Sequence, residues 1–280
     1  MRIVVTGGTG KAGRWVVADL RAAGHDVLNV DLVRDTVSDH GRTIAADLTD
    51  AGQCHDVIAG SDVVVHLAAI PAPGLRSETD TFRINILSTY NVFSAAVTHG
   101  VGRVVWASSE TVLGLPFDEQ QPLYVPVDEA HPPRPESSYA LSKLCGEVMA
   151  EQLSRRSGIP FVGLRFSNIM EPSDYTRFPG FWPDARLRSW NAWGYVDARD
   201  VAESVRLAIE ADVHGAEVCI VAAADTCMNR PSIDLMAEVF PEVPIRGTVT
   251  GRQTLLSIDR AREMLGYTGS RSWQDEIAER

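Results

Sequence analysis

The N-terminal stretch RIVVTGGTGKAGRWVVADL (2–20) constrains the fold more than any other feature, because a strand pattern, a glycine-rich turn and a helical pattern follow one another directly. Gly7, Gly10 and Gly13 are spaced three residues apart, and Gly8 offers a second start to the same pattern. Glycines permit a tight turn and let the backbone and the helix N-terminus approach a pyrophosphate. A lone glycine pattern is weak, but its place between a strand and a helix predicts a dinucleotide site.

The rest of the chain continues the alternation of apolar runs and helical patterns. Near-continuous runs of Val, Ile and Leu are typical of strands that are buried on both faces of a parallel sheet. The expected strands are 2–6, 26–31, 43–47, 62–68, 102–108, 160–166 and 216–222, and the expected helices are 11–23, 50–59, 79–99, 136–157, 199–211, 231–239 and 259–266. This order predicts an α/β fold with a Rossmann-type doubly wound parallel sheet. We expect residues 1–168 to form a nucleotide-binding domain and 169–280 a smaller substrate-binding region interleaved with the last sheet elements.

Charge and composition narrow the classes of partner. The 280 residues carry a formal net charge of −11, which argues against nucleic acid or an anionic membrane surface as the main partner. A strand pattern begins at residue 2, and no apolar run approaches ~20 residues, so we expect neither a signal peptide nor a membrane span. The cysteines show no metal-binding spacing, and the sequence therefore predicts a cytoplasmic protein without a metal site.

Acidic residues at the ends of the expected strands favour NAD as the dinucleotide. Asp31 follows Gly13 by 18 residues, where a carboxylate can accept hydrogen bonds from the adenosine ribose hydroxyls. The same charge would repel the 2′-phosphate of NADP, although Arg34 could pair with that phosphate and keeps NADP as the less favoured alternative. Further cofactor contacts are expected from Asp47, Leu48, Leu67, Ala68 and Ala69 at the ends of the next two strands.

The hexapeptide SYALSK (138–143) places Tyr139 and Lys143 four residues apart, on one face of an expected helix. A free tyrosine ionises near pH ~10, and a nearby cation lowers that pKa. The pair could therefore shuttle a proton, whereas the plainer interpretation is a packed Tyr139 beside a solvated Lys143. The hexapeptide alone does not decide between the two.

A set of motifs in a fixed order resembles the extended short-chain dehydrogenase/reductase family, the NAD-dependent epimerase/dehydratase group. The motifs are TGGTGKAG (6–13), Asp31, DL (47–48), HLAA (66–69), NILSTYN (85–91), ASSETVLG (107–114), YALSK (139–143), LRFSN (164–168) and, more weakly, YVDARDVA (195–202). The resemblance implies that Tyr139 is the catalytic acid/base and that Lys143 lowers its pKa and holds the nicotinamide ribose. It also implies that Ser109, in preference to Ser108, orients the substrate oxygen. Lys11, Ala12 and Asn85 would complete the cofactor site.

The sequence indicates the substrate less directly than it indicates the cofactor. Members of the family that act on nucleotide sugars usually carry an arginine just before the aromatic residue of the segment corresponding to WGYVDARDVA (193–202). The preceding residues in this chain are Asn191, Ala192, Trp193 and Gly194, with no arginine. The compact C-terminal part is similar to the uronate dehydrogenases, in which an arginine grips the substrate carboxylate, and Arg177 is the nearest match. Glu110 departs from that group, because a carboxylate would repel an acid but accept hydrogen bonds from a neutral polyol. Substrate contacts are expected from Ser109, Glu110, Asn168 and Arg177.

The stretch 169–195 reads as a long binding loop. Its aromatic residues would cover the apolar side of a sugar ring, and two of its cations, Arg186 and Arg188, are expected to face solvent. The aromatic residues in question are Phe178, Phe181, Trp182, Trp190 and Trp193.

Three functions remain open from the sequence. The first is an NAD-dependent dehydrogenase of a free sugar, a sugar acid or a similar small polyol. The second is a sugar or nucleotide-sugar epimerase that retains its NAD, and the third is a non-catalytic NAD-binding regulator, which the intact Ser109, Tyr139 and Lys143 disfavour. The expected helices 79–99 and 136–157 resemble the pairing surface of the family and are apolar on more than one face, which predicts a C₂ homodimer.

Overall fold

The computed structural model describes residues 1–33, 43–117 and 120–278 and confirms the expected parallel sheet. In the described part, one sheet has the strand order β3-β2-β1-β4-β5-β6-β9, and every neighbouring pair is parallel. Its strands are β1 (Arg2–Thr6), β2 (Asp26–Asp31), β3 (Thr43–Ala45), β4 (Val63–His66), β5 (Arg103–Ser109), β6 (Phe161–Phe166) and β9 (Ala216–Val221). The order reverses direction between β1 and β4, which is where doubly wound sheets bind their ligands.

The central strands are buried on both faces, as their apolar runs predict. In β1, Val4 lies opposite Leu28 of β2 and Val64 of β4, and all three side chains are almost wholly buried. Branched side chains suit this position because they pack against neighbours on both sides of a pleated surface.

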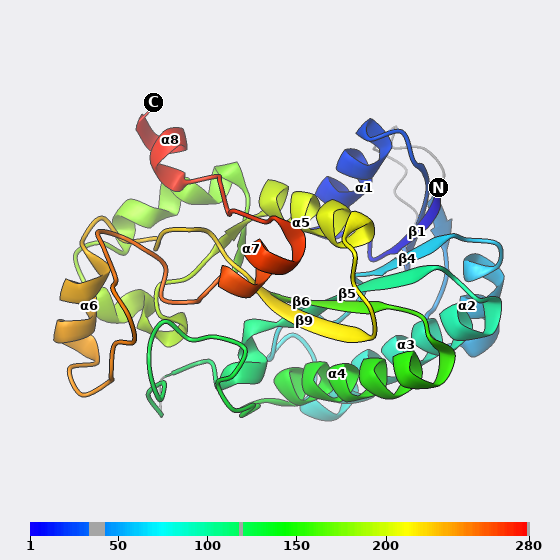
Figure 1. The fold of residues 1–280 in the computed structure, drawn as a ribbon, viewed down its shortest axis with the longest axis horizontal. Coiled ribbons are helices and arrows are strands. Elements are labelled where there is room, and N and C mark those ends of the chain that lie inside the picture. Colours follow the sequence, from blue (N-terminus) through cyan, green and yellow to red (C-terminus); the bar gives the residue numbers. More distant parts are fainter. Residues whose placement is uncertain (34–42, 118–119, 279–280) are drawn as a thin grey trace.

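Helices cover both faces of the sheet (Figure 1). The helices of these layers are α1 (Gly13–Ala22) and α5 (Ala198–Glu210) on one face and α2 (Ala51–Ile58), α3 (Glu78–His99) and α4 (Ser138–Ser157) on the other. Ser137 caps α4 by accepting a hydrogen bond from the backbone N–H of Ala140, and Gly158 ends the helix in the left-handed conformation. This cap fixes the first turn of α4, in which Tyr139 lies.

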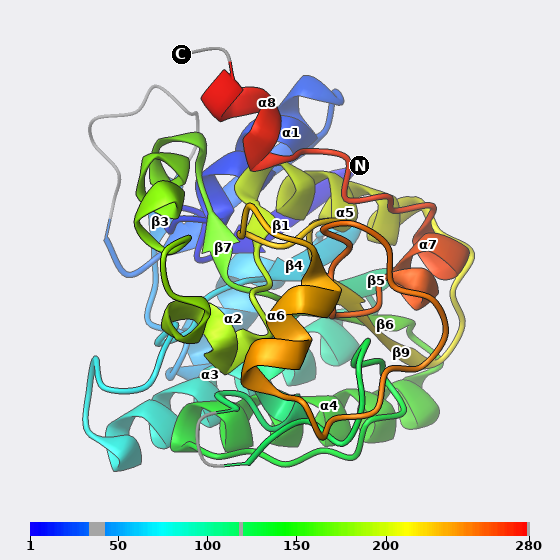
Figure 2. The ribbon, with the colours of Figure 1, turned by 90° about the vertical axis from the view of Figure 1, so that its left-hand side faces the viewer.

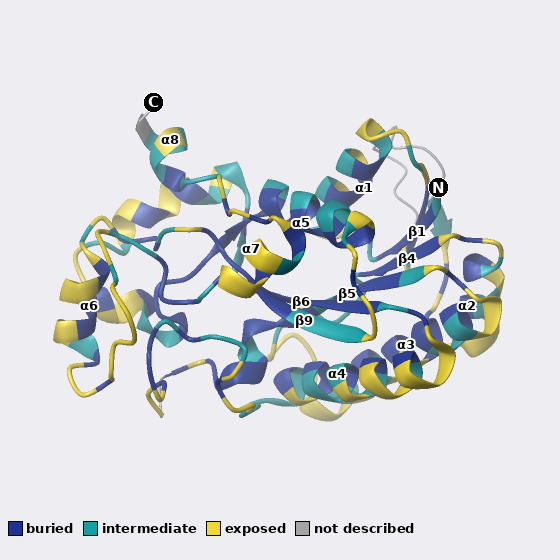
Figure 3. Cartoon of the chain, viewed as in Figure 1, coloured by how far each residue is buried: buried dark blue, intermediate teal, exposed yellow. Residues whose placement is uncertain are grey.

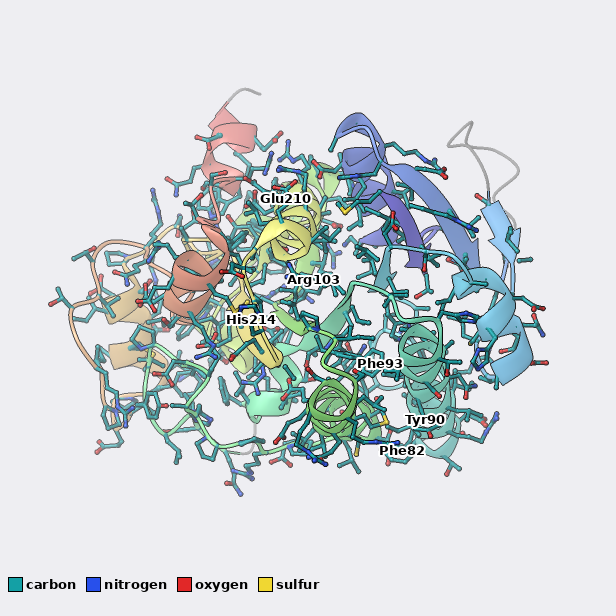
Figure 4. All side chains as sticks on the ribbon, turned by 45° about the vertical axis from the view of Figure 1, so that its right-hand side comes forward. Phe82, Tyr90, Phe93, Arg103, Glu210 and His214 are labelled. Carbon is teal, nitrogen blue, oxygen red and sulfur yellow. The ribbon has the colours of Figure 1, made fainter. Side chains whose placement is uncertain are left out.

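Two hydrophobic cores lie on the two sides of the sheet, and the helices turn their exposed residues outward (Figure 3). Phe93 of α3 is fully buried and packs edge-on against Trp106 of β5 at a ring-centroid distance of 5.5 Å. Tyr90, one turn earlier, is half exposed on the outer side of the same helix (Figure 4). Arg103, also labelled in Figure 4, ties the start of β5 to the end of α5 by donating to the carbonyls of Ala208 and Ile209 at 2.9 and 2.8 Å.

Apart from α5, α7 and β9, most of the chain after β6 lies at the carboxyl ends of the strands (Figure 2). The elements after β6 other than α5 and β9 are β7 (Ile169–Met170), η2 (Pro172–Gly180), η3 (Ala185–Asn191), β8 (Val196–Asp197), α6 (Ser232–Val239), α7 (Asp259–Leu265) and α8 (Trp273–Ala278). Of these, α7 packs beside α5 and β9. The expectation of a long loop at 169–195 was wrong, because 3₁₀ helices and the parallel β7–β8 pair organise that stretch. In the described part of the chain, no helix combines the length and the apolar character needed to cross a bilayer.

Candidate active site

A cleft of about 780 Å³ runs along the carboxyl ends of the central strands. That volume lies in the range of about 300–1,000 Å³ that is usual for small-molecule sites. Most of the residues singled out in the sequence line it, namely Gly7, Gly10, Lys11, Ala12, Gly13, Asp31, Asp47, Leu48, Leu67, Ala68, Ala69, Ser109, Glu110, Tyr139, Lys143 and Asn168. Sequence reasoning did not assign Thr9, Ser167 or Pro116, which also line it.

The glycine-rich turn needs glycine at two positions that pack closely against backbone. Gly7 has φ +72°, and a Cβ there would lie 2.6 Å from the backbone nitrogen of Ala68. A Cβ on Gly13 would lie 2.1 Å from the carbonyl oxygen of Gly7. Gly10 is less closely packed, because a Cβ there would meet only the carbonyl oxygen of Gly7, at 3.2 Å. Gly10 also lines the cleft. The turn therefore leaves its backbone accessible at the N-terminal end of α1, where a phosphate would be favoured.

Asp31 ends β2 beside this turn and is oriented by it. Its Oδ2 accepts hydrogen bonds from the backbone nitrogen and Oγ1 of Thr9, at 3.1 and 2.5 Å, and its Oδ1 accepts one from the nitrogen of Leu32 at 2.8 Å. Asp47 similarly accepts hydrogen bonds from the backbone and side chain of Thr49. Both carboxylates line the cleft in fixed orientations, as a dinucleotide site requires. Arg34 lies outside the described residues.

Asn85 supports the cleft from behind, since it is not among the residues that line it. Its side-chain amide pairs with the backbone of Ile70, accepting at 2.7 Å from the nitrogen and donating at 3.1 Å to the oxygen. The same amide donates to Ser142 Oγ at 3.3 Å. Asn85 therefore joins the loop after β4 to α3 and α4 and fixes the position of that loop at the cleft.

Tyr139 and Lys143 meet at the floor of the cleft, as the helical spacing predicts. Lys143 Nζ lies 5.7 Å from the centroid of the Tyr139 ring and donates a 2.8 Å hydrogen bond to the carbonyl of Ala107 at the end of β5. Burial lowers the pKa of Lys143 to about 8. The plainer interpretation of a solvated lysine is excluded, because Lys143 is only 7% exposed.

The pKa of Tyr139 departs from the sequence-based expectation. Burial raises it to about 12, a hydrogen bond with Ser109 opposes that rise, and the charge of Glu110 adds to it. The expected lowering of this pKa by Lys143 is not seen, because the phenolate is desolvated and the Lys143 ammonium is hydrogen-bonded to the Ala107 carbonyl. The proton of Tyr139 is therefore held tightly in this arrangement, and Ser109 is the group that eases its release.

Ser108 and Ser109 make different hydrogen bonds. Ser108 Oγ donates a 2.6 Å hydrogen bond to Glu147 Oε1 of α4, and Glu147 also binds Arg165 of β6 at 2.8 Å through both of its oxygens. This buried network joins α4 to β5 and β6. Both serines line the cleft, but the Ser108 hydroxyl is engaged by Glu147, whereas Ser109 Oγ accepts hydrogen bonds from Thr111 and interacts with Tyr139, which supports the choice of Ser109.

Glu110 is a buried carboxyl at the wall of the cleft. It is 3% exposed, and Asn191 Nδ2 donates to its Oε1 at 3.3 Å. Burial raises the pKa of Glu110 to about 7, while interactions with Ser167 and Asn191 and the positive charge of Arg188 favour its ionised form. A carboxyl that changes charge near neutrality therefore lies directly after Ser109 in the chain.

Two expectations about cations are corrected by the structure. Arg177 has a side chain that is 69% exposed, pairs with Asp174 at 3.7 Å and is not among the residues that line the cleft. Arg188, expected to face solvent, is buried, and its guanidinium lies over the rings of Phe181 and Trp190. Sequence patterns could not separate the two, because η2 and η3 have no strong periodicity to show which side faces inward.

The aromatic residues of 169–195 mostly build core. Phe178 and Trp193 are fully buried, and Trp182 donates through Nε1 to the carbonyl of Cys227 at 3.1 Å. Trp190 is the member of this group that lines the cleft. The expected aromatic wall is therefore reduced to one side chain in the described structure.

Comparison with known proteins gives the same family for most of the chain. A family model described as "NAD dependent epimerase/dehydratase family" matches residues 3–221. A uronate dehydrogenase from Pseudomonas syringae pv. tomato is 31% identical over 183 residues, 65% of this chain and 64% of that protein. An L-arabinose 1-dehydrogenase (NAD(P)(+)) from Haloferax volcanii is 32% identical over 176 residues, 60% of this chain and 67% of that protein. An NAD-bound short-chain dehydrogenase/reductase superfamily protein from Agrobacterium tumefaciens aligns with a TM-score of 0.77 at 25% identity, covering 100% of this chain and 95% of that one.

Proposed function

The chain belongs to the NAD dependent epimerase/dehydratase family, and from that premise we propose that it oxidises a secondary alcohol of a small, unactivated carbohydrate with NAD as the oxidant. The observation that carries this proposal concerns the two ends of one cleft. Ser109, Tyr139 and Lys143 line one end, and the glycine-rich turn lines the other. Relatives named uronate dehydrogenase and L-arabinose 1-dehydrogenase support a sugar or sugar-acid substrate.

The residues of the cleft fit a dinucleotide. The open backbone at Gly10 and the start of α1 suit a pyrophosphate, and Asp31 suits the two hydroxyls of an adenosine ribose. The Asp31 carboxylate would repel a 2′-phosphate, so NAD is preferred over NADP. When bound, NAD supplies a hydride acceptor.

The side chains near Ser109 divide the work of alcohol oxidation. Ser109 orients the substrate hydroxyl, and Tyr139, acting as the tyrosinate, accepts the hydroxyl proton as the carbonyl forms. Lys143 contributes a buried positive charge that favours the tyrosinate, most strongly when its ammonium turns from the Ala107 carbonyl. A tyrosine whose pKa is raised by burial can accept a proton only if a nearby positive charge stabilises its phenolate during the reaction.

The charges along the cleft support a small substrate. Among the described residues that line the cleft, the cations are Lys11, in the glycine-rich turn, and Lys143, beside Tyr139. Lys11 also pairs with Asp174 at 2.5 Å. A nucleotide sugar carries a diphosphate that needs arginine or lysine forks, or a helix N-terminus, in addition to those that bind NAD. The substrate end of the cleft offers no second cluster of this kind in the described structure, which favours a free sugar.

An epimerase that retains NAD is the second candidate, because the name of the family includes that activity. The two activities are separated by incubating the purified protein with NAD and a panel of free sugars, sugar acids and UDP-sugars. A dehydrogenase accumulates NADH, measured by its absorbance, and a ketone or lactone product. Conversion of a UDP-sugar to its epimer without NADH accumulation would instead support the epimerase.

We also propose that two copies pair through α3 and α4. Leu87 and Tyr90 of α3 and Leu141 and Val148 of α4 are between 36% and 54% exposed on the outer faces of these adjacent helices. A four-helix contact around a twofold axis would bury these side chains, as the sequence analysis expected. A cytoplasmic location likewise remains a prediction from the sequence.

A further inference from the structure

We propose that Glu171 and Asp174, at the start of η2, form an ionic strap with the glycine-rich turn and α1 that slows release of the bound dinucleotide. The strap comprises the ion pairs Lys11–Asp174 and Arg14–Glu171 and a hydrogen bond from Trp15 to Glu171. The inference rests on NAD binding and is independent of which sugar is oxidised. It assigns Glu171 and Asp174 as positioning residues that control the exchange of NADH for NAD.

The contacts of the strap join two distant parts of the chain. Lys11 Nζ donates to Asp174 Oδ2 at 2.5 Å, and Arg14 Nε donates to Glu171 Oε1 at 3.0 Å. The same oxygen of Glu171 accepts a 2.7 Å hydrogen bond from Trp15 Nε1. The side chains of Glu171 and Asp174 are only 15% and 19% exposed. Because these carboxylates are partly shielded from water, their attraction to the two cations is stronger than that of a fully solvated pair.

The start of η2 is a fixed anchor for the strap. The backbone nitrogen of Glu171 donates to Asp174 Oδ2 at 3.0 Å, so the two carboxylates are held relative to each other. Tyr175, the next residue after Asp174, is buried and donates a hydrogen bond from its hydroxyl to the buried Asp197 at the end of β8. The cations have more freedom, since the side chains of Lys11 and Arg14 are 41% and 48% exposed. The strap therefore opens when these two long side chains turn into solvent.

The strap lies at the rim of the cleft, beside the place where the pyrophosphate would bind. Lys11 lines the cleft, whereas Asp174 and Glu171 are not among the described residues that do so. Asn168 and Ile169, just before Glu171 in the chain, line the cleft as well. The strap thus ties the cofactor wall of the cleft to its substrate wall. A dinucleotide held between these walls leaves when they separate, so the free energy of the strap contacts adds to the barrier for release.

A competing role for Asp174 predicts the opposite effect. If Lys11 serves the pyrophosphate directly, Asp174 only draws the ammonium away from the phosphates. Replacing Asp174 by asparagine would then free Lys11 and slow the release of NADH. In the strap, the same replacement removes one of the ties and speeds the release.

The test measures NADH release by stopped-flow fluorescence, with NADH-loaded protein mixed with an excess of NAD. The variants are Asp174→Asn, Glu171→Gln and the charge-swapped double variant Arg14→Glu with Glu171→Arg. Asp19→Asn is the matched control, because Asp19 lies further along α1, pairs with Arg206 at 2.9 Å and is not among the described residues that line the cleft. Hydrogen exchange of residues 169–180 in the protein without cofactor gives a readout that does not depend on NADH.

We expect Asp174→Asn and Glu171→Gln each to release NADH about 3- to 10-fold faster than the wild type, between the effects of an exposed ion pair and of a buried charged hydrogen bond. Both variants should also speed hydrogen exchange in 169–180. The charge-swapped protein should release NADH more slowly than Glu171→Gln. Raising the salt concentration should speed release from the wild type more than from Glu171→Gln, because salt screens the exposed cations of the strap. Asp19→Asn should leave the release rate unchanged.

Three results would overturn the strap while leaving NAD binding and the sugar dehydrogenase intact. The first is slower release from Asp174→Asn, which supports the competing role of that residue. The second is an unchanged rate in Glu171→Gln, and the third is an equal acceleration in Asp19→Asn, which indicates a general loosening of α1. If the wild type binds neither NAD nor NADH, the proposed function itself fails.

Discussion

The buried carboxyl of Glu110 makes a prediction about stability that is independent of any substrate. Burial raises its pKa from 4.5 to about 7 in the folded protein. A carboxyl whose folded pKa is raised stabilises the folded state at low pH, and that contribution is lost as the pH rises through the folded pKa. Glu110→Gln has nearly the same shape and cannot titrate, so the difference between wild type and variant isolates this one group.

The magnitude follows from the two pKa values. Between about pH 5 and about pH 8, the free energy of unfolding of the wild type should fall by about 2–3 kcal/mol relative to the variant. Other titrating groups contribute equally to both proteins and cancel in the difference. Guanidinium titrations at several pH values, analysed by linear extrapolation, measure both free energies.

The control variant is Glu151→Gln, whose side chain is exposed on α4. The difference in the free energy of unfolding between this control and the wild type should not change across the same pH range. If the difference in the free energy of unfolding between Glu110→Gln and the wild type also changes by less than about 0.5 kcal/mol, the reasoning is refuted. A desolvated carboxyl that titrates in this pH range must change that difference.

Three further predictions concern catalysis, cofactor choice and assembly. Tyr139→Phe should lower kcat by about 10²- to 10⁴-fold with NAD affinity retained, as measured by steady-state kinetics and calorimetry, and activity within tenfold of the wild type would contradict its role. The wild type should prefer NAD, and Asp31→Ser should narrow the gap in kcat/KM between NAD and NADP, whereas equal values for the wild type would contradict the role of the carboxylate. Val148→Glu, at a half-exposed position on α4, should convert a dimer to a monomer in light scattering, and Ile233→Glu, equally exposed on α6, should not. A wild type that is monomeric at micromolar concentration would refute the proposed pairing.

Local sequence was sufficient to predict the sheet and its covering helices, including the helix that carries Tyr139 and Lys143. Long apolar runs and glycine positions are short-range signals, and the structure has a strand or helix at each expected place in the sheet layers. The meeting of Tyr139 and Lys143 also follows from local geometry, since residues four apart share a helical face. That the glycine-rich turn, Asp31 and Asp47 line one cleft could be predicted because parallel strands bring their carboxyl ends to one edge.

The substrate half was decided only by tertiary structure. The segment 169–195 folds into 3₁₀ turns without strong periodicity, so the sequence could not show that Arg177 is exposed and Arg188 is buried. Ser167 could not be distinguished from its neighbours before β6 was placed beside β5. The pKa of Tyr139 likewise depends on burial and on the charge of Glu110, which are properties of packing. Spacing along the chain thus determined which residues share an element, whereas desolvation and contacts between distant segments determined what those residues can do.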